Sequence, residues 1–132
     1  VFGVDNVHDT NAWNTPHATL TPHPRYRFMA ADQMDDTFYK CLAADWPQGF
    51  DICIDDGGHF IDQIVASFKG LWSQVKSGGF YCCEDLGCGG TPGSVFLKPG
   101  YPTHMQWVHS LMERSDVDSF YFAGELLILR KK

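Results

Sequence analysis

The sequence lacks the long apolar runs and the basic charge that mark membrane-spanning and nucleic-acid-binding proteins. No run in its 132 residues approaches the roughly 20 apolar residues that cross a bilayer, and Val1–Asp5 does not resemble a signal peptide. Lys and Arg number 10 against 16 Asp and Glu, so the formal net charge is −6. This charge disfavours nucleic acid and anionic membranes and favours small molecules and divalent cations. We expect a cytoplasmic protein with a small-molecule partner and no nucleic-acid or membrane partner, and homo-oligomer formation stays open.

The cysteines lack the number and the spacing of a disulfide framework or a zinc site. They are five, an odd number, and no CxxC pair occurs. Cys82 and Cys83 are adjacent, so in a strand their side chains point to opposite faces. We expect all five to act as small hydrophobic residues rather than as crosslinks or metal ligands.

Apolar runs that end in a carboxylate predict strands of an α/β sheet. The runs are 1–4, 25–31, 50–54 and 80–83, and the acids that follow them are Asp5, Asp32, Asp55-Asp56 and Glu84-Asp85. Residues 6–24, which include His8, His17 and His23, show neither helical nor strand periodicity and predict a long exposed connection. With 44% hydrophobic residues, the chain can bury one core and is short for two domains.

Three segments have the pattern of helices. Apolar residues recur at helical spacing from Ile61 to Val75, and the run Ser77-Gly78-Gly79 ends that pattern. Asp35-Asp36-Thr37 offers capping oxygens for a short helix that follows it. Thr103 is placed to cap a third helix.

The order of these elements predicts an α/β fold. Strand, helix and strand between Phe50 and Cys83 form a βαβ unit, whose strands are parallel and joined by a right-handed crossover. Segments 117–122 and 125–129 predict an antiparallel hairpin around Ala123-Gly124. We expect a mostly parallel sheet with helices on both faces and an antiparallel hairpin at its C-terminal end.

Two acidic pairs, Asp55-Asp56 and Glu84-Asp85, follow the strands of the βαβ unit. Neighbouring parallel strands lie about 4.8 Å apart, so these side chains can converge at one sheet edge. Close carboxylates repel one another unless a cation lies among them, and oxygen ligands suit Mg²⁺. The pattern favours a metal site over the alternative, in which Asp55 or Asp56 caps the helix that begins near Phe60.

His59 follows the acids on a Gly57-Gly58 turn at the same sheet edge. A neutral imidazole there could take a proton from a substrate hydroxyl, which makes His59 the candidate general base. The alternative is a structural role in the turn.

Three motifs in order resemble the macrocin and mycinamicin O-methyltransferase family and its cephalosporin-hydroxylase-like relatives. They are Ala31-Asp32-Gln33, the run FDICIDDGGH at 50–59 and the run SGGFYCCEDL at 77–86. The family shows a GDQ-like element, an IDDGSH motif and a GGxYxxED motif in that order. The resemblance covers residues 25–86 well, with Ala31 in place of Gly and Gly58 in place of Ser. It implies a Rossmann-like O-methyltransferase that uses S-adenosylmethionine and Mg²⁺ on a hydroxyl of a sugar or polyketide-like acceptor.

The resemblance also implies roles for the acids and the histidine. It places Mg²⁺ on Asp56, Glu84 and Asp85, and it makes His59 the base.

Further roles follow from the resemblance together with the strand order. Asp5 is expected at the ribose hydroxyls of the cofactor, Asp32 and Gln33 at its adenine, and Asp55 among the other cofactor-binding residues.

The segment Asp85–Gly90 reads DLGCGG, letters that open the cofactor loop of many methyltransferases. Such a loop turns directly into a helix, whereas five glycines and three prolines lie between residues 86 and 102 here. We interpret residues 86–102 as a substrate-side lid instead.

The Gly-rich first strand and turn of a Rossmann-like methyltransferase find no match in the sequence. We therefore expect residues 1–132 to be the C-terminal two-thirds of a single methyltransferase catalytic domain, a fragment that need not be active alone. A reduced relative that cannot hold the cofactor unaided is the alternative.

Two other functions remain open on the sequence. A metal-dependent oxygenase or hydrolase could use the same acids, and an iron site of two histidines and a carboxylate would need His104 or His109 as its second histidine. The second open function is that of a non-catalytic remnant that serves as an interaction module.

Overall fold

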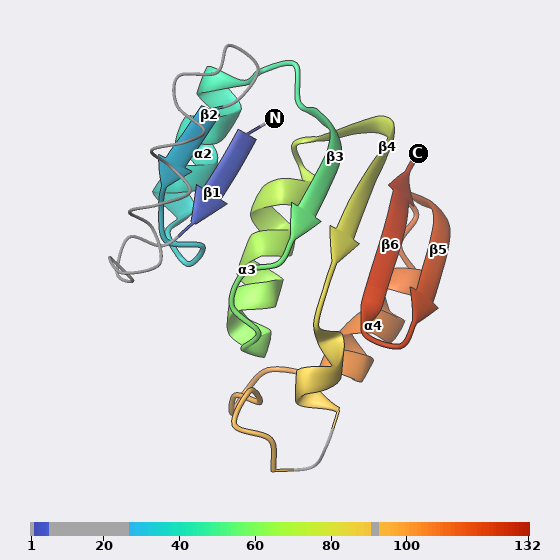
Figure 1. Ribbon diagram of the computed structural model, residues 1–132. Helices are drawn as coiled ribbons and strands as arrows, with labels where there is room; N and C mark the ends of the chain where they lie inside the picture. Colours follow the sequence, from blue (N-terminus) through green and yellow to red (C-terminus); the bar gives the residue numbers. More distant parts are fainter. Residues whose placement is uncertain (1, 6–26, 91–92) are drawn as a thin grey trace.

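The structure, a computed structural model, describes residues 2–5, 27–90 and 93–132 (Figure 1). The expected connection 6–24, with its three histidines, lies outside the described residues. The elements in chain order are β1 (Phe2–Asp5), β2 (Arg27–Ala30), α2 (Asp36–Asp45), β3 (Phe50–Asp55), α3 (Ile61–Trp72), β4 (Val75–Cys83), the 3₁₀ turn η1 (Leu86–Gly89), α4 (His104–Met112), β5 (Val117–Ala123) and β6 (Leu126–Lys131).

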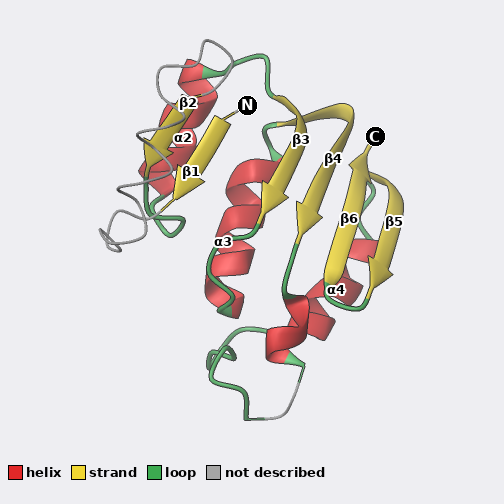
Figure 2. Ribbon diagram, viewed as in Figure 1, coloured by secondary structure: helices red, strands yellow, loops and turns green. Residues whose placement is uncertain are grey.

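The strands form two sheets, β1-β2 and β3-β4-β6-β5 (Figure 2). β1 pairs with β2 in parallel, and β3 pairs with β4 in parallel. β6 is antiparallel to both β4 and β5, so among the described strands it is the reversed one. The predicted α/β class, the parallel βαβ unit and the C-terminal hairpin are therefore confirmed.

The boundary between α3 and β4 differs from the expectation. The helix ends at Trp72, and Val75, which the apolar pattern assigned to the helix, begins β4 instead. The backbone N–H of Phe50 donates to the Gln74 carbonyl over 2.8 Å. Because this bond pairs the segment with β3, strand β4 begins directly after Gln74. Gly78 and Gly79, expected to end the helix, lie inside the strand, where a Cβ on Gly79 would come within 2.8 Å of the Asp51 carbonyl.

The helix starts follow the predicted capping chemistry. The Asp35 carboxylate accepts from the Thr37 N–H at 2.8 Å and caps α2. Thr103 and Gln106 form a reciprocal capping box at the start of α4. Among the described residues, no helix is long and apolar enough to cross a membrane.

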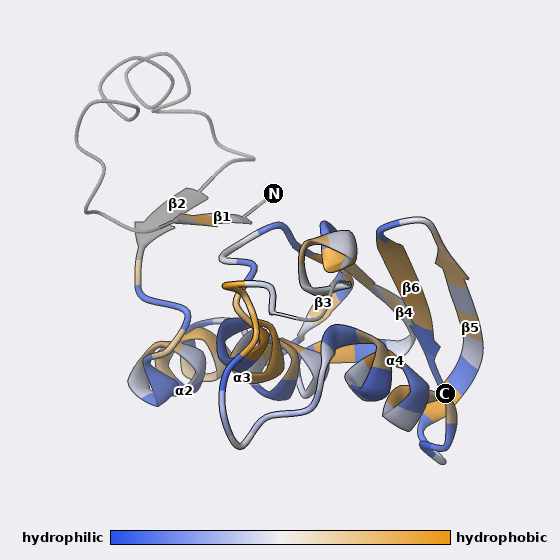
Figure 3. Ribbon diagram, turned by 90° about the horizontal axis from the view of Figure 1, so that it is seen from below, coloured by the Kyte–Doolittle hydropathy of each residue, from blue (hydrophilic) through white to orange (hydrophobic). Residues whose placement is uncertain are grey.

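The three α-helices of the described residues lie on the same side of the sheet (Figure 3). The core lies between that side and α3 and α4, and includes Phe68, Trp72, Tyr81, Trp107 and Leu127. The opposite face is open: Ile52, Ile54 and Tyr121 keep 60%, 63% and 57% of their surface exposed. The expectation of helices on both faces is therefore wrong for the described part of the chain. A layer of helices on the open face would have to be formed by residues outside the described ranges.

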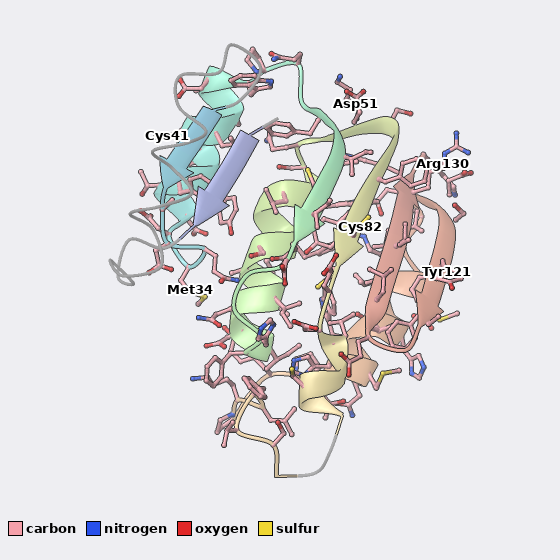
Figure 4. The ribbon with its side chains drawn as sticks, viewed as in Figure 1. Met34, Cys41, Asp51, Cys82, Tyr121 and Arg130 are labelled. Atoms are coloured by element: carbon pink, nitrogen blue, oxygen red, sulfur yellow. The ribbon has the colours of Figure 1, made fainter. Side chains whose placement is uncertain are left out.

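The expectation that every cysteine acts as a small hydrophobic residue holds for Cys53 and Cys83, which are buried, whereas Cys41 is exposed. All five are free. The adjacent pair in β4 splits as strand alternation requires, with Cys83 buried and Cys82 partly exposed on the open face with Tyr121 (Figure 4).

Candidate active site

The ends of β3 and β4 form a common acidic edge. Asp55 pairs with Cys83 in the parallel register, and the Glu84 N–H donates to the Asp55 carbonyl over 3.0 Å. The residues that follow each strand, Asp56 on one side and Glu84-Asp85 on the other, are therefore adjacent. The sequence prediction that two acidic pairs share one edge is confirmed at the level of the backbone.

Asp55 and Asp56 point to different surroundings because side chains alternate along a strand. Asp55 is 7% exposed, and its carboxylate accepts a 2.7 Å hydrogen bond from the Tyr81 hydroxyl. Burial raises the pKa of Asp55, and the Tyr81 hydrogen bond partly opposes that rise. Asp56 is exposed. Asp55 thus belongs to the buried side of the site, whereas Asp56 faces solvent and can meet a ligand.

The carboxylates of Asp56, Glu84 and Asp85 share the edge without pointing at one centre. No group of three or more Asp, Glu, His or Cys side chains that could hold a metal forms among the described residues. The Asp85 carboxylate lies instead 3.6 Å from Nε2 of His59. Asp85 also has φ 56° and is the one non-glycine among the described residues with positive φ. Such a backbone is uncommon and is concentrated at functional sites.

His59 stands on the Gly57-Gly58 turn as the sequence predicts. The Gly58 N–H donates to Oε1 of Gln33 over 2.6 Å, and Nε2 of Gln33 donates to the Ser67 hydroxyl over 3.0 Å. The Tyr39 hydroxyl donates to the backbone carbonyl of Gln33 over 2.7 Å. The side chain of Gln33 therefore links the end of β2 to the turn that presents His59.

The alternative role of Asp55 or Asp56 as a helix cap is wrong. Phe60 occupies the N-cap of α3, and no side chain caps that helix. The Ile61 N–H donates to the Phe96 carbonyl at 3.0 Å instead. The Phe96 ring also lies edge-on to the His59 imidazole, with 6.2 Å between ring centroids. The segment interpreted as a lid therefore contacts His59 and the start of α3.

A cavity of about 640 Å³ lies between β1-β2 and β3, and its lining includes Asp32, Gln33, Asp55 and Asp56. Phe38, Leu42 and Phe50 supply an apolar wall. This size falls within the range of about 300–1,000 Å³ that is usual for small-molecule sites. Four of the residues predicted to bind cofactor or metal thus line one cavity.

The remaining cofactor candidate, Asp5, ends β1 and pairs through its backbone with Ala30; its side chain lies outside the described residues. The Asp32 carboxylate accepts from the Met34 N–H at 2.8 Å, which shapes the turn after β2.

The DLGCGG segment forms η1, a single 3₁₀ turn, and the next helix of the described residues begins at His104. The prediction that no helix follows this Gly-rich segment directly is confirmed.

The buried residues that support the acids were missed from the sequence. Ser67 lies within an ordinary core pattern; Tyr81 stands at the Tyr of the GGxYxxED motif and His104 was considered only as an iron ligand, so the supporting role of each was not predicted. His104 is fully buried and contacts the His59 backbone, while His109 is exposed on α4. Neither is a ligand at the acidic edge, so the iron-site alternative lacks its second histidine among the described residues.

The fold and the acidic edge define the class. The chain superposes on the solved methyltransferase MycE of the mycinamycin biosynthetic pathway, in complex with Mg and SAH, with a TM-score of 0.77 and 26% identity. The match covers 98% of this chain and 36% of that one. The architecture is that of a class I methyltransferase.

Within this class, the sequence is similar to O-methyltransferases of the macrocin and mycinamicin type. It is 40% identical over 63 residues to the 8-demethyl-8-alpha-L-rhamnosyl tetracenomycin-C 2'-O-methyltransferase of Streptomyces olivaceus, covering 48% of this chain and 16% of the relative. It is 39% identical over 69 residues to the demethylmacrocin O-methyltransferase of Streptomyces fradiae, covering 52% and 17%. The chain thus spans about a sixth of these curated relatives. No protein-family model matches it.

Proposed function

We propose that this protein is an S-adenosylmethionine-dependent and Mg²⁺-dependent O-methyltransferase that acts on a sugar hydroxyl of a small natural product. The observation that carries the proposal is the Glu84 to Asp55 backbone hydrogen bond, which brings both acidic strand ends beside the His59 turn. One of the similar proteins is named as the 2'-O-methyltransferase of an alpha-L-rhamnosyl tetracenomycin, which supports the choice of acceptor.

The residues fit both groups in their chemistry. Asp56, Glu84 and Asp85 offer the hard oxygen donors that Mg²⁺ prefers, from adjacent strand ends. Gathering them around one ion would need side-chain rotation, since Asp85 points at His59. For S-adenosylmethionine, the cavity beside Asp32 and Gln33 has polar groups at the sheet edge and an apolar wall behind them.

The chain's own residues divide the work of methyl transfer. When bound, S-adenosylmethionine supplies an electrophilic methyl group and Mg²⁺ polarises the acceptor hydroxyl. His59 would take the proton of the acceptor hydroxyl, whose oxygen would gain the methyl group as the methyl–sulfur bond breaks and S-adenosylhomocysteine leaves. Nε2 of His59 lies 3.6 Å from the Asp85 carboxylate, which would turn from the ring to the ion when Mg²⁺ binds. Gln33 orients the turn through the Gly58 N–H.

The same proposal covers the extent of the domain and its setting. Residues 1–132 are the C-terminal two-thirds of one catalytic domain, because the open face of the sheet and the cavity beside β1 leave room for a further strand and helices. The protein acts in the cytoplasm, without a nucleic-acid or membrane partner, and its open face is compatible with a homo-oligomer.

Methyl transfer from labelled cofactor to a panel of glycosylated macrolides, by the full-length protein, tests the function. His59→Ala should lower kcat by about 10²-fold while leaving Mg²⁺ binding in place, because a general base contributes on that scale. His109→Ala, an exposed histidine on α4, is the matched control and should keep full turnover.

Two results would contradict the proposal. Full turnover of His59→Ala across neutral pH would return His59 to a structural turn residue. Turnover that survives removal of divalent metal by a chelator would exclude the Mg²⁺ role.

A further inference from the structure

His104 is a fully buried polar residue outside the acidic edge. It begins α4, its side chain is 0% exposed, and its Nε2 lies 2.9 Å from the backbone carbonyl oxygen of His59. A carbonyl oxygen can only accept, so Nε2 of His104 is the donor in this bond. The bond joins α4 to the residue assigned as the base, across a sequence separation of 45.

The His104 ring fits closely against η1. Gly89 is itself buried, and a Cβ on Gly89 would overlap the His104 imidazole. The glycine at this position of the DLGCGG segment is therefore explained by close packing against His104 rather than by contact with a cofactor. The motif that resembles a cofactor loop thus provides, at Gly89, the space that the His104 ring occupies; this space is called the His104 seat below.

The His104 imidazole lowers the stability of the fold at this position, because one of its two nitrogens has no hydrogen-bond partner. Nδ1 of His104 is buried and has no hydrogen-bond partner among the described residues. Leaving a buried polar atom without a hydrogen-bond partner is destabilising. An apolar side chain of similar size would fill the seat without that cost, so the bond to the His59 carbonyl accounts for a histidine here.

The His59 turn is held from two sides. Gln33 accepts from the Gly58 N–H on one side of the His59 peptide, and His104 donates to the His59 carbonyl on the other. The imidazole of His59 lies between the Asp85 carboxylate and the edge of the Phe96 ring. Fixing the backbone at His59 therefore fixes the direction of its side chain toward the acidic edge.

We propose that His104 is a positioning residue that holds the His59 backbone and so sets the base at the acidic edge. The effect on catalysis rests on the proposed function, whereas the effect on the turn does not. A displacement of about 1 Å at a reacting group can cost about 10²-fold in rate, so a single backbone anchor at the base is consequential.

The test compares His104→Leu, His104→Gln and His109→Leu in the full-length protein. Leu fills the seat but removes the donor, Gln carries an amide donor at a similar reach, and His109 is an exposed control on the same helix. We expect His104→Leu to lower kcat roughly tenfold or more, with KM for S-adenosylmethionine unchanged within about twofold. His104→Gln should recover most of kcat, and His109→Leu should match the wild type.

Hydrogen exchange supplies a measurement that needs no turnover. In His104→Leu, the peptide covering residues 57–61 should exchange about fivefold faster than in the wild type, since one hydrogen bond that holds this turn is lost. A peptide covering β6 should stay unchanged. If His104→Leu does not fold, His104→Asn replaces it, because its amide is one methylene shorter than that of Gln and falls short of the His59 carbonyl.

Several outcomes would overturn the proposal. Wild-type exchange at 57–61 together with wild-type kcat in His104→Leu would remove any anchoring role. Equal losses in His104→Leu and His104→Gln, with exchange rising across all of α4, would make His104 a packing residue only. If the wild type itself transfers no methyl group, the proposed function fails, and the exchange comparison still decides whether His104 holds the turn.

Discussion

Among single residues, the adjacent acids at the end of β3 have different environments despite identical side chains. Asp55 turns into the core, where Tyr81 donates to it, and Asp56 turns to solvent. Alternation along the strand, not side-chain type, decides which of them can meet a cation. Because Asp55 is in register with Cys83, Glu84 follows β4 at the level of Asp56, and both acids are exposed.

This difference predicts unequal effects of two charge-removing substitutions. Glu84→Gln should weaken Mg²⁺ binding by roughly tenfold or more, because it removes an exposed carboxylate from the proposed site. Asp55→Asn should change Mg²⁺ affinity much less, since Asn can still accept from the buried Tyr81 hydroxyl. Calorimetric titration of Mg²⁺ into both variants of the full-length protein measures the difference. Equal losses would mean that Asp55 also faces the ion.

At the scale of the elements, hydrogen bonds to Asp116 connect the end of α3 to the turn before β5. The Trp72 indole N–H donates to the Asp116 carboxylate over 2.7 Å, and Arg114 makes a two-pronged contact with the same carboxylate at 2.9 and 2.7 Å. The Arg114 hydrogen bonds, and after them that of Trp72, lower the pKa of Asp116 to about 2. The carboxylate thus ties the helix that follows the His59 turn to the C-terminal hairpin.

The lowered pKa predicts how stability depends on pH. Since the pKa falls from 3.8 to about 2 on folding, the contribution of Asp116 is complete above 3.8 and is lost as pH falls toward 2. The side chain is 41% exposed, so solvent screening limits this contribution to about 1 kcal/mol at neutral pH. Asp116→Asn should destabilise by that amount at pH 7, and the difference from wild type should shrink below pH 4.

Urea denaturation followed by tryptophan fluorescence at pH 7, 4 and 2.5 measures this difference. Asp118→Asn is the control, because its partner Arg130 lies 3.4 Å away at an exposed position. A pH-independent loss in Asp116→Asn would show that packing, rather than charge, is involved.

For the whole molecule, the unequal faces of the sheet are the main feature. One face carries α3 and α4 (Figure 3), while the other leaves Ile52, Ile54 and Tyr121 largely exposed. Figure 4 labels Tyr121 on that face. Sheets of the doubly wound type are covered on both faces. This face is therefore where the proposed remainder of the catalytic domain would pack.

The proposal predicts the cost of a charge on this face. Ile54, 63% exposed here, would be nearly indifferent to a polar substitution if the face were open to water. In the full-length protein, Ile54→Asp should instead lower the free energy of unfolding by about 2 kcal/mol or more, because a charge would be buried without a partner. Met112→Asp, at a position 59% exposed on α4, should cost little. Equal small effects in a thermal or urea unfolding comparison would mean that nothing covers β3.

Much of the fold and part of the site were predictable from the sequence. Alternation and helical spacing set the order of strands and helices, Asp35 and Thr103 capped the helices they precede, and the acids followed the strands. These features depend on residues close together in the chain, whose geometry the backbone itself fixes.

Other features were decided only by tertiary contacts. β4 began at Val75 rather than after the glycines because β3 offered hydrogen bonds to that segment. The direction of the Asp85 side chain and the contact of His104 with His59 depend on residues 26 and 45 positions apart in sequence. The sequence by itself therefore determined which residues reach the acidic edge, because strand ends are local. Packing between distant segments decided how those residues point, since burial and hydrogen bonding across the sheet have no local signal.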